Sequence, residues 1–116
     1  MTTDPMPRPW LAHYADGVPA DVDLPTESLY TPLEMAAARF GDRVALDFFG
    51  AATSYAELED GVARAAHALR ELGVRPGDRV ALVLPNCPQH VVAFYAVLRL
   101  GAIVVEHNPL STAAEF

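Results

Sequence analysis

The sequence predicts an α/β fold, with a βαβ unit in a mostly parallel sheet and an extended N-terminal arm. Two apolar runs, residues 80–84 and 102–106, flank an apolar helical pattern within about thirty residues, a spacing typical of parallel strands joined by a crossover helix. Five prolines and several aspartates in residues 1–28 predict an irregular arm. We therefore expect an arm over residues 1–28 and an incomplete α/β subdomain over residues 29–116.

The arm also carries large apolar side chains, among them Trp10, Tyr14 and Leu24. Apolar groups of this size favour an arm that docks on a surface over one that stays in solvent. A loose leader is the alternative, because chain termini are often poorly held.

The first expected helix opens at Thr31 as its cap, with Pro32 at its first position and Glu34 three residues after the cap. A strand is expected over residues 44–49. A turn should follow over residues 50–53.

The second expected helix begins at Ser54, with Glu57 completing a capping box, and Gly73 stops it. Within it, Gly61 marks a close contact with another element or is a tolerated substitution. One face of this helix repeats at helical spacing and should be buried. Its members are Leu58, Val62, Ala65, Leu69 and Leu72.

The third expected helix has Asn86 as its cap and Pro88 near its first position, with Gln89 as the capping-box partner. It has almost no polar face, which predicts packing on more than one side. Its first turn offers N–H groups to an anion, but ordinary capping explains the same residues. Thr112 and Glu115 then resemble the start of a fourth helix, which indicates an incomplete chain.

Composition excludes several classes of function. The net charge is −7, and all eight basic residues are scattered arginines, which argues against nucleic-acid binding. The absence of lysine excludes a phosphate-loop, Schiff-base or adenylate-stabilising lysine within these residues. A single cysteine allows no intrachain disulfide and fits a cytoplasmic protein. The start lacks the pattern of a signal peptide, and Arg99 and Gly101 interrupt the longest apolar stretch, so no membrane span is expected.

No residue of the chain is assigned a catalytic, cofactor-binding or metal-binding role. Glycine-rich phosphate loops are absent, and the histidines lack the spacing of a zinc site. His107 is the most interesting of them, because it follows an expected strand end, where parallel sheets bind ligands; a structural or solvent-facing role is still favoured. His90 is expected to be solvated. Cys87 lies at a helix start that could activate it, but an inert, partly buried thiol is favoured.

Four stretches carry a family resemblance. They are PWLAHYADGVPADVDL (residues 9–24), SYAEL (54–58), GVRPGDRVALVLPNCP (73–88) and GAIVVEHNPLSTAAEF (101–116). In this order they resemble the opening of the AMP-forming acyl-CoA synthetases, which belong to the adenylate-forming superfamily. The first stretch is similar to the long-chain fatty acid–CoA ligase branch, although Ser111 stands where that branch usually has tyrosine.

The resemblance implies a partial N-terminal subdomain of an adenylate-forming ligase. It implies that a fatty acid attacks ATP with the help of Mg²⁺, giving acyl-adenylate and pyrophosphate, and that coenzyme A then displaces AMP. The family's catalytic motifs lie beyond Phe116, so these residues should be inactive alone. Implied partners are the rest of the ligase chain, fatty acid and coenzyme A, together with a homodimer through the arm and peripheral contact with a membrane. A stand-alone remnant or interaction module without catalytic activity is the alternative.

Overall fold

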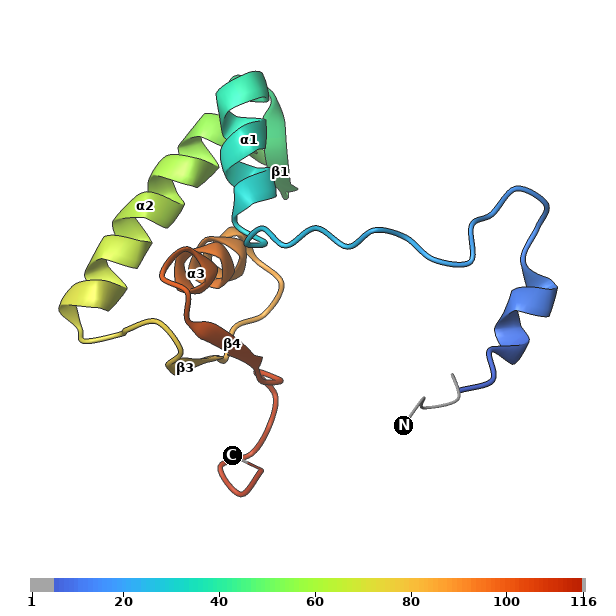
Figure 1. Cartoon of the computed structure of the whole chain (residues 1–116). Coiled ribbons are helices and arrows are strands. Elements are labelled where there is room, and N and C mark those ends of the chain that lie inside the picture. The colour runs from blue at the N-terminus through green and yellow to red at the C-terminus, as the bar shows by residue number, and fades with distance from the viewer. Residues whose placement is uncertain (1–5, 116) are drawn as a thin grey trace.

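The structure is a computed structural model that describes residues 6–115. Three α-helices and two small sheets form a body, from which the arm extends away (Figure 1). The α/β class expected from the sequence is confirmed. The elements are η1 (a 3₁₀ helix, Pro9–His13), α1 (Thr31–Phe40), β1 (Val44–Phe48), β2 (Ala51–Ser54), α2 (Tyr55–Glu71), β3 (Arg79–Leu82), α3 (Pro88–Arg99) and β4 (Ile103–Glu106).

The expected βαβ unit is present. Strands β3 and β4 pair in parallel, from Arg79 opposite Ile103 to Leu82 opposite Glu106, and α3 connects them. The last bond of the pair runs from the His107 N–H to the Leu82 carbonyl, at 3.0 Å. No residue of β4 pairs with β3 beyond Leu82. Strand β3 therefore ends at Leu82, two residues before the end of the apolar run at residue 84.

Strand β3 is not fully buried, contrary to the expectation for residues 80–84. Exposure alternates along it, with Leu82 buried and Ala81 exposed. The reason is that α3 covers one face of the pair, whereas no helix within residues 6–115 covers the other. Val83 and Ile103 are consequently exposed.

The turn expected over residues 50–53 is wrong, because Ala51–Ser54 is a strand, β2, paired antiparallel to β1. The hairpin closes at Phe49 and Gly50, whose φ angles of 52° and 83° are both positive, as a type I′ turn requires. A side-chain oxygen of Asp47 accepts a hydrogen bond from the Gly50 N–H at 3.0 Å. Pairing with β1, rather than strand propensity, creates β2 from small residues.

Only one of the three expected capping boxes forms. At the start of α2, the Ser54 hydroxyl accepts from the Glu57 N–H at 3.2 Å, and the Glu57 carboxylate accepts from the Ser54 N–H at 2.8 Å. Both hydrogen bonds to Ser54 hold the pKa of Glu57 below its ordinary value, and the bond from the Ser54 backbone N–H has the larger effect. This box is local, since both partners lie within one helical turn.

The other two caps were wrongly assigned. Helix α1 is preceded by Tyr30 and makes no side-chain cap, because Thr31 is already helical. Helix α3 has Cys87, not Asn86, at its cap, again without a side-chain bond, while Pro88 begins the helix. The backbone of Cys87 is extended, and this places the first helical turn one residue later than expected.

The core lies where α2 packs against α1 and α3. Within it, Leu58 and Val62 are buried as expected, but Leu72 is 83% exposed, because α2 ends at Glu71 and Leu72 lies beyond the packed face. A Cβ atom on Gly61 would lie 3.6 Å from Val92, which confirms the expected contact with another helix. The buried residues of this cluster are Tyr30, Leu33, Leu58, Val62, Ala66 and Ala96.

The two ends of the described chain lie outside this core. The arm does not dock on the body: it leaves α1 and runs away from it, and its described residues before Tyr30 are not buried (Figure 1). The expected fourth helix does not form within the described residues: residues 112–115 make a single hydrogen-bonded turn, in which a Glu115 carboxylate oxygen accepts from the N–H and hydroxyl of Thr112 at 2.7 and 2.9 Å. No helix between residues 6 and 115 combines the length and apolar character needed to cross a bilayer.

Candidate functional site

Chemistry-bearing side chains gather at the carboxyl edge of the β3–β4 pair. His90, in the first turn of α3, places Nε2 at 3.0 and 2.9 Å from the two carboxylate oxygens of Glu106, the last residue of β4. The side chains are 20% and 50% exposed, respectively. The expectation that His90 would be solvated is therefore wrong, because the crossover returns β4 to the start of α3.

A hollow of about 400 Å³ lies beside this pair, between β1 and the start of α3. Its lining is mainly apolar, and the thiol of Cys87, which is free and half-buried as expected, belongs to it. The lining residues are Ala45, Leu46, Asp47, Phe48, Asn86, Cys87, Pro88, His90 and Val91.

The His90–Glu106 pair has one element of a catalytic arrangement, a histidine oriented by a carboxylate. The other elements are absent from residues 6–115: no serine, threonine or cysteine side chain hydrogen-bonds to His90, and no group of three potential ligands could hold a metal ion. What the pair does in this structure is join the first turn of α3 to the end of β4.

His107 lies where the sequence placed it, just after β4 at the carboxyl edge of the sheet. Its backbone N–H extends the parallel pair by bonding to Leu82. This bond involves the backbone alone, so the structural or solvent-facing role expected for the His107 side chain stays a prediction.

A second polar cluster joins all three helices. The Tyr30 hydroxyl donates to Glu59 Oε1 at 2.7 Å, while Arg99 Nη1 donates to the Tyr30 hydroxyl and to Glu59 Oε1, each at 2.7 Å. The pKa of Tyr30 is raised to about 12, mainly by burial and to a smaller extent by the hydrogen bond to Glu59. The cluster ties the residue before α1 to the second turn of α2 and the end of α3.

Sequence reasoning missed this cluster. Arg99 was interpreted only as an interruption of an apolar stretch, although a charged residue ending an apolar helix is a signal that it has a partner. The partner could not be identified, since Tyr30 and Arg99 are 69 positions apart.

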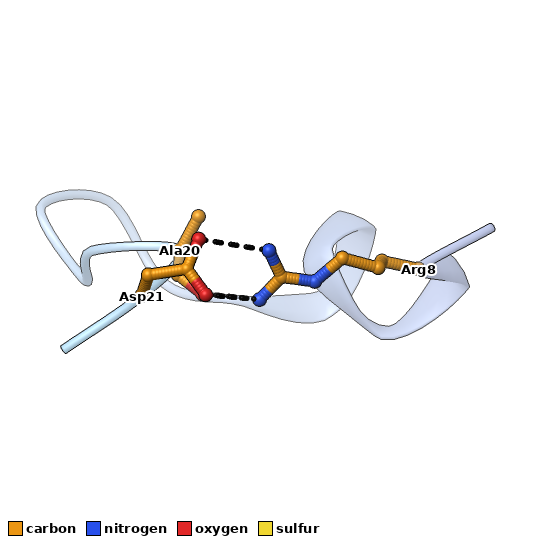
Figure 2. A network of polar contacts seen from close by, with 3 residues as sticks. All are labelled: Arg8, Ala20 and Asp21. Atoms are coloured by element: carbon orange, nitrogen blue, oxygen red, sulfur yellow. Dashed lines mark hydrogen bonds and ion pairs between the residues drawn. The ribbon is translucent and has the colours of Figure 1, made fainter. Parts of the chain in front are cut away.

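The arm has a polar contact of its own, shown in Figure 2. Arg8 donates from its two terminal nitrogens to the two Asp21 carboxylate oxygens at 2.8 and 2.9 Å, and to the Ala20 carbonyl at 2.6 Å. Hydrogen bonding raises the pKa of Arg8 and lowers that of Asp21. We call this contact the arm clasp; it closes residues 8–21 into a loop that contains η1.

Comparison with known proteins gives a consistent result. Residues 33–116 match the family model described as AMP-binding enzyme. A long-chain-fatty-acid–CoA ligase of Bacillus subtilis (strain 168) is 42% identical over 108 residues, which are 93% of this chain and 19% of the relative. The chain thus spans about a fifth of the length of the curated relatives it matches.

Solved structures agree with this match. The N-terminal subdomain of NpsA from Klebsiella oxytoca superposes with a TM-score of 0.72 at 28% identity, over 75% of this chain and 23% of that one. A benzoate CoA ligase from Burkholderia xenovorans LB400 gives a TM-score of 0.72 at 32% identity, over 77% and 18%. The resemblance on which the sequence expectation rested is confirmed, including its relation to the long-chain branch.

Proposed function

Because the chain belongs to the AMP-binding enzyme family, we propose that it forms the first α/β part of a long-chain fatty acid–CoA ligase. The observation that supports this most is the 42% identity to such a ligase over nearly the whole chain. The reaction of the full-length enzyme would convert ATP, fatty acid and coenzyme A to acyl-CoA, AMP and pyrophosphate through an acyl-adenylate.

The residues of this chain do not fit ATP or Mg²⁺. Lysine and a glycine-rich phosphate loop are both absent from the sequence. Residues 6–115 also contain no cluster of side chains that could hold a metal ion. ATP, Mg²⁺ and coenzyme A would therefore be bound by the full-length ligase, with this part acting as scaffold. The isolated chain should be inactive.

The inactivity can be tested directly. The purified 116-residue chain should show no exchange of pyrophosphate into ATP that depends on a long-chain fatty acid, because the chain has neither a lysine nor a glycine-rich loop to hold the phosphates of ATP. Fatty-acid-dependent exchange above that of a heat-denatured control would contradict the scaffold role.

The ligase assignment needs a second experiment, in which this chain replaces the matching segment of the Bacillus subtilis relative. We expect the hybrid to keep fatty-acid-dependent formation of AMP within about tenfold of the parent, because the exchanged segments are 42% identical over 108 residues and the catalytic motifs come from the parent. A hybrid carrying Val62→Asp, which breaks the core, is the inactive control. A soluble, folded hybrid without activity would favour the alternative of a remnant or interaction module.

The exposed apolar side chains of the arm favour a role in assembly, whether the chain is part of a ligase or a stand-alone interaction module. The arm presents these side chains on a loop closed by the clasp, and we propose that it mediates a homodimer. Sedimentation of the whole chain beside a chain lacking residues 1–28 tests this: a dimer should dissociate on truncation, and equal masses would exclude the arm as the contact.

We further propose that the full-length ligase is cytoplasmic and makes peripheral contact with membranes. The single cysteine of this chain supports the location. The fatty acid in the name of the matching ligases supports the contact with membranes. Co-sedimentation with phosphatidylglycerol vesicles at low and high salt measures the contact, and a full-length protein that remains in the supernatant at both would contradict it.

A further inference from the structure

We draw no further inference here: the strongest candidate, the hollow lined by Arg70, Arg75 and Arg99 at the ends of α2 and α3, carries none, because each guanidinium group already bonds within the chain and nothing in the structure shows what covers the hollow.

Discussion

The arm and the body use similar side chains in opposite ways. Trp10 and Leu24 in the arm are 48% and 80% exposed, whereas Leu58 and Val62 in α2 are 3% and 0% exposed. Apolar residues in α2 recur at helical spacing and meet another helix, whereas the regular structure in the described part of the arm is limited to one short 3₁₀ helix, η1, which buries none of its side chains. Apolar content alone therefore does not build a core; periodicity and a facing element are also needed.

The body and the arm also differ in the interactions that stabilise them. Packing of α2 on α1 and α3 stabilises the body, with the buried Tyr30 cluster at its margin. The arm is held by the Arg8–Asp21 contact, which is exposed and hence weak in solution. Substitutions in the two regions should consequently differ in their effect on unfolding.

The largest difference is expected between Leu58→Ala and Trp10→Ala. The first removes buried methyl groups from the core and should lower the free energy of unfolding by about 2–5 kcal/mol. The second changes an exposed side chain of the arm and should alter it by less than about 0.5 kcal/mol. Urea denaturation followed by circular dichroism measures both. Similar losses for the two variants would mean that the arm belongs to the cooperative unit.

The Tyr30 cluster gives a pH-dependent prediction. Because the folded state raises the pKa of Tyr30 to about 12, its contribution to stability is complete below pH 10 and is lost as the pH rises from about 10 to 12. Tyr30→Phe should cost about 1–2 kcal/mol at neutral pH and show a smaller loss across that alkaline window.

Tyr14→Phe is the matched control for that experiment, since Tyr14 lies exposed on the arm. It should leave both the stability and its alkaline dependence unchanged. If Tyr30→Phe and the wild type lost stability in parallel between pH 10 and 12, the cluster would not be the origin of the effect.

Gly61 offers a gain in stability within the body. An added methyl group would lie 3.6 Å from Val92, an ordinary contact, and alanine is the better helix former. Gly61→Ala should therefore raise the free energy of unfolding by about 1 kcal/mol in urea denaturation. Gly50→Ala is the contrasting variant, because φ is 83° there and the substitution should destabilise the hairpin. A loss of stability in Gly61→Ala would show that glycine is required for helix contact.

The smallest effect is expected for Asp21→Ala, which removes both carboxylate acceptors of the arm clasp without touching the body. The urea midpoint should stay unchanged, while chymotrypsin should cleave more rapidly beside Trp10 and Tyr14 as the loop opens. Asp23→Ala, two residues along the arm and outside the clasp, is the control and should be cleaved like the wild type. Equal cleavage of all three proteins would show that the clasp does not order the arm.

Sequence reasoning succeeded where the deciding contacts are local. The Ser54–Glu57 box lies within one helical turn, and Gly73 follows the end of α2 with a positive φ of 103°. The βαβ unit was predicted because its apolar runs are close in sequence. Strand β2 was missed, since its identity depends on pairing with β1, and the Tyr30–Arg99 contact joins residues too distant to be matched by pattern.

No site was assigned from the sequence, and the structure adds a joined pair, His90 and Glu106, rather than a complete catalytic arrangement. Their proximity follows from the return of β4 beside β3, which brings residues 16 positions apart into contact. Neither residue carries a motif that could have indicated the contact.

The amino-acid sequence by itself determined the helices α1, α2 and α3, the crossover unit, the lack of lysine chemistry and the family resemblance. Each of these depends on composition or on residues within a few turns of one another. Which faces are buried was decided by tertiary contacts: Leu72 shares the pattern of Leu58, yet it is exposed because α2 ends before it. Whether the outer edge of β1 is paired is likewise decided by the other strands and not by β1 itself. Burial and edge exposure are properties of neighbouring elements, and a single element does not encode its neighbours.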